Sequence, residues 1–344
     1  MDDRDRHLLN LMQNDFPLVD RPFLALARQI GTTEDDVLAR VQRLRAEKIL
    51  RQVSAIFDTR SLGYKSSLVA MRAAPHRVHE AAQIVNEHPG VSHNYERNHE
   101  FNLWFTIAVP PSSDLEAVVW RLHELAGAES TRILYTLKLF KIGVDLDMVG
   151  ERPPDAQAEP QYTEAKRARA LSSRLTERDI AVIRELQEDV PAIPEPYAPM
   201  AARLGWSTAE LFAAAQDLQQ RGFLRRVAAI MYHRKAGFRS NAMGVWKVPP
   251  ERTAEIGPKM AAFAAVSHCY ERPVYPDWPY SIFTMIHGRS DEECTAILRA
   301  ISEATGITEY RALYSTREYK KTRVRYFTDD YAKWEAKYLL VPAG

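Results

Sequence analysis

The sequence predicts an α+β protein made of two tandem copies of one unit, each a winged helix-turn-helix followed by a ferredoxin-like βαββαβ domain. The heptad VSHNYER at residues 91–97 recurs as VSHCYER at residues 266–272. Other segments match in the same order, such as Leu50–Phe57 with Leu224–Met231. Self-similarity over so long a separation indicates duplicated domains. We therefore expect the two halves to form a pseudo-dimer.

Each copy is predicted to begin with three helices and a strand. In the first copy these elements span residues 4–14, 21–29, 33–48 and 50–57. Thr33 precedes three acidic residues, as a helix N-cap does, and Gly31 stands where the turn before the third helix is needed. Residues 174–231 repeat the pattern, with Gly205 at the turn. This order of elements is typical of a winged helix-turn-helix.

An alternation of strands and helices follows in each copy. The first copy is predicted to have strand 66–73, helix 76–88, strands 91–97 and 101–109, helix 113–126 and strand 131–141. The second is predicted to have strand 240–248, helix 251–264, strands 266–272 and 280–287, helix 291–304 and strand 308–320. This order is βαββαβ, the ferredoxin-like arrangement.

The predicted boundaries follow from these elements and from one change in composition. Residues 151–173 are rich in Pro, Ala, Gln and charge, so we expect an exposed linker there. The four predicted domains are winged helix-turn-helix domains at 1–58 and 174–232 and βαββαβ domains at 59–150 and 233–344.

Composition narrows the class of protein. The chain has 344 residues and a formal net charge of +1, which gives no global attraction to nucleic acid. Its two cysteines, Cys269 and Cys294, have no metal-type spacing and fit a reducing compartment. No membrane-spanning stretch is evident, and the first six residues are too polar for a secretory signal. We expect a soluble, cytoplasmic protein that does not bind membranes.

The heptads carry the residues best suited to chemistry. Side chains alternate along a strand, so Val91, His93, Tyr95 and Arg97 are predicted to share one face, with Ser92, Asn94 and Glu96 on the other. In the second copy the shared face would hold His268, Tyr270 and Arg272. A single His and Tyr on a strand is readily explained by packing. Because the whole triplet is duplicated, a binding or catalytic site is the better interpretation.

The halves differ after the second heptad, where the chain inserts residues 273–279 with three prolines. Proline cannot donate to a strand ladder, so we expect a rigid loop that presents Tyr275 and Trp278. Trp278, together with Tyr280, is predicted either to contact a flat ligand as a lid or simply to pack within the loop. His99 lies in the corresponding hairpin of the first copy and is a weaker candidate.

The combined architecture resembles the leucine-responsive regulator/AsnC family, whose members bind DNA as dimers and sense amino acids. The two heptads, with the segment Tyr275–Gly288, resemble more closely the siroheme (sirohaem) decarboxylases. In that family two AsnC-like subunits, or a fusion of two, remove carbon dioxide from two acetate side chains of siroheme. Ser281 departs from the pattern, which favours Asn, as at Asn102.

This resemblance implies a substrate, a product and roles for the heptad residues. Siroheme, an iron tetrapyrrole, would be converted to didecarboxysiroheme on a route to heme or to the heme of nitrite reductase, with no cofactor required. His93 and His268, aided by Tyr95 and Tyr270, would supply protons, although either His could ligate the siroheme iron instead. The arginines that would hold carboxylates are Arg97 and Arg272 in the heptads and Arg51, Arg225 and Arg226 on neighbouring strands.

The alternative function is an AsnC-type transcriptional regulator, in one version a heme sensor. It would need a basic recognition helix in each copy to read the major groove. The first copy offers Arg40, Arg43, Arg45 and Lys48, but residues 206–215 of the second are almost without positive charge. We therefore do not expect DNA to be a partner. A homodimer of the fused chain, and which half holds the productive site, are left open by the sequence.

Overall fold

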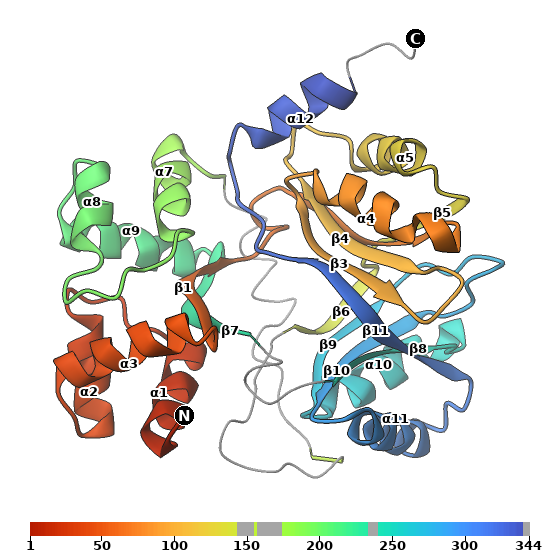
Figure 1. Cartoon of the computed structure of the whole chain (residues 1–344), viewed down its shortest axis with the longest axis horizontal. Coiled ribbons are helices and arrows are strands. Elements are labelled where there is room, and N and C mark those ends of the chain that lie inside the picture. The colour runs from red at the N-terminus through yellow and green to blue at the C-terminus, as the bar shows by residue number, and fades with distance from the viewer. Residues whose placement is uncertain (143–154, 157–173, 233–239, 340–344) are drawn as a thin grey trace. The chain divides into compact units, whose positions relative to one another are not determined.

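The computed structural model describes residues 1–142, 155–156, 174–232 and 240–339, so nearly all of the predicted linker lies outside the described residues. These residues form two compact units rather than two separate halves. One unit combines the helix-turn-helix domains of both copies, and the other combines both βαββαβ domains (Figure 1). Each predicted domain therefore packs with its own duplicate.

The helix-turn-helix unit has the elements that the sequence predicts. They are α1 (Asp3–Asn14), α2 (Pro22–Ile30), α3 (Glu34–Ala46) and β1 (Leu50–Phe57) in the first copy, and α7 (Glu177–Leu186), α8 (Ala198–Arg203), α9 (Thr208–Gln220) and β7 (Leu224–Met231) in the second. Thr33 caps α3 by accepting a hydrogen bond from the Asp36 N–H. Gly31 ends α2 at φ 68°, a backbone conformation that glycine adopts without strain.

The strands of this unit join the two copies. β1 pairs with β7 in an antiparallel ladder, with Val53 opposite Ala229, so each strand completes its partner from the other copy. Each of the two strands is thus paired with a strand of the other copy, which agrees with a role for these domains in holding the halves together.

The second unit contains both βαββαβ domains. Its elements are β2 (Lys65–Arg72), α4 (Val78–Asn86), β3 (Val91–Arg97), β4 (Leu103–Val109), α5 (Leu115–Ala126), β5 (Ser130–Leu134) and β6 (Lys138–Ile142), followed by β8 (Ser240–Trp246), α10 (Thr253–Ala262), β9 (Val266–Glu271), β10 (Ile282–Gly288), α11 (Asp291–Thr305) and β11 (Tyr310–Lys321). The prediction of one unbroken strand at 131–141 is wrong, because residues 135–137 separate β5 from β6.

The last strand of each copy crosses to the other copy, interrupted between β5 and β6 in the first copy and unbroken as β11 in the second. The nine strands follow the order β5-β2-β4-β3-β11-β8-β10-β9-β6. β11 pairs first with β8 of its own copy and then with β3 of the first copy. In the same way β5 pairs with β2, and β6 continues onto β9. β5 and β6 stand at opposite edges of this order but are consecutive segments of the chain. The sheet therefore curves back on itself and encloses an inner space.

Three apolar cores fill this unit. Two lie between the sheet and the helices, one under α4 and α5 and one under α10 and α11. The third lies on the inner face and combines both copies, with Trp104, Leu134, Phe283 and Leu313 among its members.

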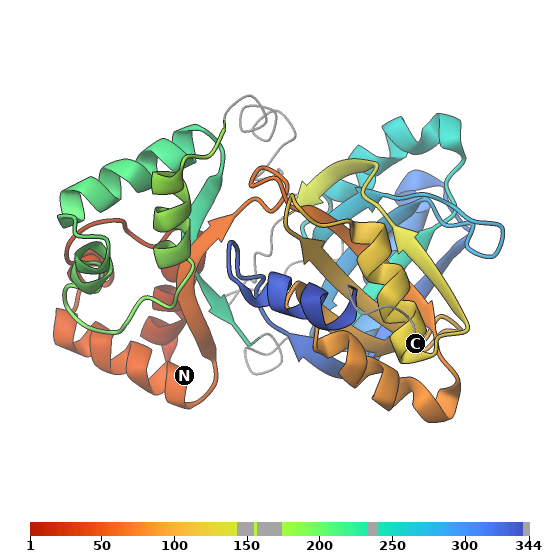
Figure 2. The same cartoon turned by 90° about the horizontal axis from the view of Figure 1, so that it is seen from above.

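One helix of this unit was not predicted. α12 (Asp330–Tyr338) lies beside α4 and α5, where Trp334 joins the outer core (Figure 2). Among the described residues, no helix is long and apolar enough to cross a membrane.

Candidate functional site

Both heptad strands begin with the same irregularity. In β3, Val91 pairs with Ile107 and His93 with Thr106, so Ser92 is an extra residue that forms a β-bulge. β9 has the same bulge at Ser267. The bulge reverses the alternation, and Val91 therefore packs in the outer core under α4. The prediction that Val91 shares the face of the triplet is wrong, because a two-residue period does not continue through a bulge.

The first His-Tyr-Arg triplet does share one face. The rings of His93 and Tyr95 lie 6.2 Å apart, and the Arg97 guanidinium lies 5.6 Å from the centre of the Tyr95 ring. Because of the bulge, the Ser92 hydroxyl reaches Nδ1 of His93 at 3.0 Å and the Thr106 hydroxyl at 2.8 Å. These hydroxyls hold the imidazole in a fixed orientation, as a proton donor requires.

The second triplet repeats this geometry with one change. His268 and Tyr270 lie 6.1 Å apart, and the Arg272 guanidinium lies 4.7 Å from the Tyr270 ring. The Ser267 hydroxyl contacts Nδ1 of His268 at 2.9 Å. The strand partner of His268 is Met285, whereas that of His93 is Thr106. The strand neighbour of His268 is therefore less polar than that of His93.

The two arginines are buried and bridge the copies. Arg97 is 6% exposed and Arg272 is 7% exposed, so neither is a solvated strand end. Arg97 donates a hydrogen bond from Nη1 to the carbonyl of Leu313, 2.7 Å away, and Arg272 donates to the carbonyl of Leu134. Burial lowers the pKa of Arg97 to about 10. Arg97 forms no ion pair with a described residue, so its charge is available to an acidic ligand.

Both histidines lie toward one end of the inner space. Lys321 of β11 is the strand partner of His93. His287 follows Met285, the partner of His268, at the next inward position of β10. Burial and then the charge of Lys321 lower the pKa of His287 to about 4, so these two residues interact. The end of β3 that holds His93 and the end of β10 that holds His287 are thus close. The sequence pattern did not single out Lys321 or His287, because only the crossing of β11 brings them together.

Trp278 is not a lid. Its side chain is fully buried, and its ring lies 5.1 Å from Trp104, 5.1 Å from Tyr280 and 5.9 Å from Phe101. The prediction that the loop presents Trp278 outward is therefore wrong, and the burial agrees with the alternative that Trp278 packs against its neighbours. Most of the residues around Trp278 are aromatic and bury its indole, which a short, proline-stiffened loop can direct inward.

The rest of the insertion is held against β5. Asp277 accepts hydrogen bonds from Arg132 at 3.0 and 2.6 Å, and the Tyr275 hydroxyl donates to the carbonyl of Ile133 at 2.7 Å. His99 also contacts the Trp278 ring, at 5.2 Å, and accepts a hydrogen bond from the Phe101 N–H. The insertion therefore closes the inner core at the end opposite to the histidines.

The remaining candidate arginines belong to the other compact unit. Arg51, Arg225 and Arg226 lie on β1 and β7 in the helix-turn-helix unit, where the Arg51 guanidinium lies 5.6 Å from the Tyr232 ring. Lys320, another cation near the heptads, donates to the carbonyl of Asn86 and so points to the helix side of the sheet. Among the described residues, no group of His, Cys, Asp and Glu could hold a metal ion by itself.

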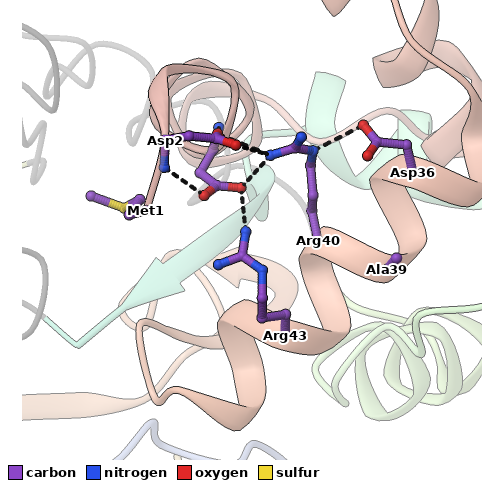
Figure 3. Close-up of a pocket in the computed structure, with 7 residues that line it drawn as sticks. Met1, Asp2, Asp36, Ala39, Arg40 and Arg43 are labelled. Atoms are coloured by element: carbon purple, nitrogen blue, oxygen red, sulfur yellow. Dashed lines mark hydrogen bonds and ion pairs between the residues drawn. The ribbon is translucent and has the colours of Figure 1, made fainter.

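The basic residues of α3, the helix of the first copy that would have to read DNA, are paired within the molecule. Arg40 contacts Asp2, Asp5 and Asp36 at 2.8 to 2.9 Å, and Arg43 contacts Asp5 at 2.7 Å (Figure 3). Arg40 lowers the pKa of Asp2 to about 2, so the acid is ionised at neutral pH. Arg45 pairs in turn with Asp189. These acids offset the charge that a DNA-reading helix would need.

Comparison with known proteins identifies both kinds of domain in the chain. Residues 61–141 and 235–320 match the AsnC-like ligand binding domain, and residues 5–51 and 179–225 match the siroheme decarboxylase NirDL-like HTH domain. The siroheme decarboxylase of Hydrogenobacter thermophilus is 39% identical over 95% of this chain and 96% of its own length. The beta subunit of the Methanosarcina barkeri siroheme decarboxylase is 45% identical over 43% of this chain and 97% of its own length.

Solved structures give the same result over the whole chain. The crystal structure of the siroheme decarboxylase NirDL aligns with a TM-score of 0.74 at 34% identity and covers 98% of both chains. NirDL in complex with an iron-uroporphyrin III analogue aligns with a TM-score of 0.72, covering 98% of this chain and 99% of the other.

Proposed function

Because this chain belongs to the siroheme decarboxylase family, we propose that it removes carbon dioxide from the two acetate side chains of siroheme. The product would be didecarboxysiroheme, a precursor of heme or of the heme of nitrite reductase. The complex of the similar NirDL with an iron-uroporphyrin III analogue supports a tetrapyrrole as the ligand.

The observation that carries this proposal is the duplicated, inward-facing His-Tyr-Arg row. Loss of carbon dioxide from an acetate on a pyrrole is made easier when a ring carbon is protonated, because the ring can then accept the electron pair of the breaking bond. Histidine is the usual donor near neutral pH. Hydroxyl contacts at Nδ1 orient both His93 and His268 for this role. The reaction consumes one proton per acetate and needs no oxidant, so no redox cofactor is required.

The arginines support the same reaction in a different way. A buried guanidinium is costly unless it is paired, and Arg97 has no acidic partner among the described residues. A carboxylate of the substrate would supply that partner, because the planar guanidinium binds carboxylates with two parallel hydrogen bonds. We assign two roles to Arg97 and Arg272: each binds a substrate carboxylate, and each links the two copies. Either His93 or His268 could ligate the siroheme iron, with the other acting as the acid.

The test is anaerobic incubation of the pure protein with siroheme, followed by mass analysis of the pigment. We expect stepwise loss of two carboxyl groups without any added cofactor. An unchanged pigment, together with tight and salt-sensitive binding of a DNA fragment, would overturn the proposal in favour of a regulator.

A further inference from the structure

The two histidine sites differ in the strand that lies beside each of them. On β11, Lys321 lies opposite His93. On β6, the residue opposite His268 is Ile142. Lys321 and Ile142 are equivalent by register, since each is the last residue of the strand that crosses to the other copy. One site therefore has a cation where the other has an aliphatic side chain.

The residues opposite the two tyrosines, the next side chains on the inner face, show the same difference between the sites. The residue opposite Tyr95 is Glu318, which is exposed, whereas the residue opposite Tyr270 is Leu139, which is 6% exposed. Met285 adds a further apolar side chain beside His268, where the first copy has Thr106. Both sites share the His-Tyr-Arg row, but the neighbouring strands are polar and charged beside His93 and apolar beside His268.

The charge of Lys321 acts within the inner space. Lys321 is only partly exposed, and its charge is one of the two causes that keep His287 neutral. The residue equivalent to His287 in the first copy is Ala108. The cation is therefore close to both copies, at the end of the inner space where the two histidines lie.

We propose that the two sites divide the work: Lys321 anchors one substrate carboxylate beside His93, and decarboxylation takes place beside His268. This inference rests on the proposed function. A cation directly beside the reacting carboxylate stabilises its charged ground state and so opposes loss of carbon dioxide, which is why we assign Lys321, Arg97 and Arg272 to carboxylates that do not react in that step. An apolar surrounding leaves the carboxylate poorly solvated, which favours a reaction that disperses its charge. Leu139, Ile142 and Met285 supply that surrounding at the second site.

The step is balanced without a co-reactant. The bond between the acetate methylene and its carboxylate breaks, and carbon dioxide leaves. His268 protonates a pyrrole carbon, and the electron pair of the breaking bond passes into the ring and leaves an exocyclic methylene. The methylene then takes up a proton as the ring carbon gives one back, so one proton is consumed in total and the acetate becomes a methyl group. The second acetate would react after the pigment turns, with a different carboxylate held by Lys321.

The experiment exchanges the two equivalent residues. We expect Lys321→Ile to weaken binding of iron-uroporphyrin III by about tenfold at low salt and to reduce the salt dependence of binding, because one cation is lost. Turnover of bound siroheme should change much less. Lys321→Arg should retain the affinity. Ile142→Lys should bind iron-uroporphyrin III at least as tightly as the wild type but turn over siroheme at least about tenfold more slowly.

Two results would overturn the proposal. Wild-type affinity and salt dependence in a folded Lys321→Ile variant would show that Lys321 is no anchor. A wild-type rate in Ile142→Lys would show that the apolar site is not the productive one. The binding measurement uses iron-uroporphyrin III, so it tests the anchor even if the wild-type protein fails to decarboxylate siroheme. Circular dichroism of each variant, and recovery by Lys321→Arg, separate loss of the cation from a folding defect.

Discussion

Replacing Trp278 by Ala decides whether the inserted loop is part of the core or a cover for the ligand. The indole is fully buried and contacts Phe101, Trp104 and Tyr280. Removing a buried tryptophan leaves a large cavity, which costs about 3 to 5 kcal/mol. Trp278→Phe keeps an aromatic ring and should lose less. We expect Trp278→Ala to lower the urea midpoint of unfolding strongly, measured by circular dichroism.

The matched control lies on the same loop. Val274 is 55% exposed, so Val274→Ala should change the free energy of unfolding by less than about 0.5 kcal/mol. Binding of iron-uroporphyrin III to whatever fraction of Trp278→Ala stays folded should be nearly normal. Unchanged stability with a large loss of binding would show that Trp278 contacts the ligand, and our assignment of the loop to the core would be refuted.

Three further predictions concern the site itself. His268→Ala should lower siroheme turnover by about two to four orders of magnitude and His93→Ala by clearly less; equal and small losses would argue against acid catalysis by His268. Arg97→Ala should weaken iron-uroporphyrin III binding and also lower the unfolding midpoint, because the guanidinium ties the copies through the carbonyl of Leu313; no change in either quantity would contradict both roles. The pKa of His287 is about 4 in the folded protein, below its ordinary value of 6.5. At pH values between these two, the unfolded protein therefore binds more protons at His287 than the folded protein does. Stability should therefore fall by on the order of 2 kcal/mol as the pH drops from about 6.5 to about 4, and His287→Gln should flatten this dependence in urea titrations.

Much of the fold could be predicted because the chain repeats itself. The duplicated heptad aligned the halves, and caps such as Thr33 marked helix starts that the structure confirms. The crossing of β11 could not be predicted, since strand pairing between copies depends on contacts distant in sequence. The break at residues 135–137 is its counterpart in the first copy. α12 was missed because a short helix gains its stability mainly from packing, here through Trp334.

The shared face of the His-Tyr-Arg residues was predicted, but their surroundings were not. A strand period placed His93, Tyr95 and Arg97 together, and the structure confirms this arrangement. The same period misplaced Val91, because a bulge leaves no clear mark in sequence. The sequence left open whether Trp278 faces a ligand or packs inward, since an insertion rich in proline can turn its aromatic residue either outward or into the core.

The two His-Tyr-Arg rows together form the site that we propose for decarboxylation, so a variant that lacks both histidines should be inactive. Wild-type protein and a His93→Ala, His268→Ala double variant are each incubated with siroheme without oxygen, and the pigments are analysed by mass. We predict that the wild type converts siroheme to the didecarboxylated product, and that the folded double variant still binds iron-uroporphyrin III but leaves siroheme unchanged. Conversion by the double variant at the wild-type rate would show that neither histidine is needed for the decarboxylation.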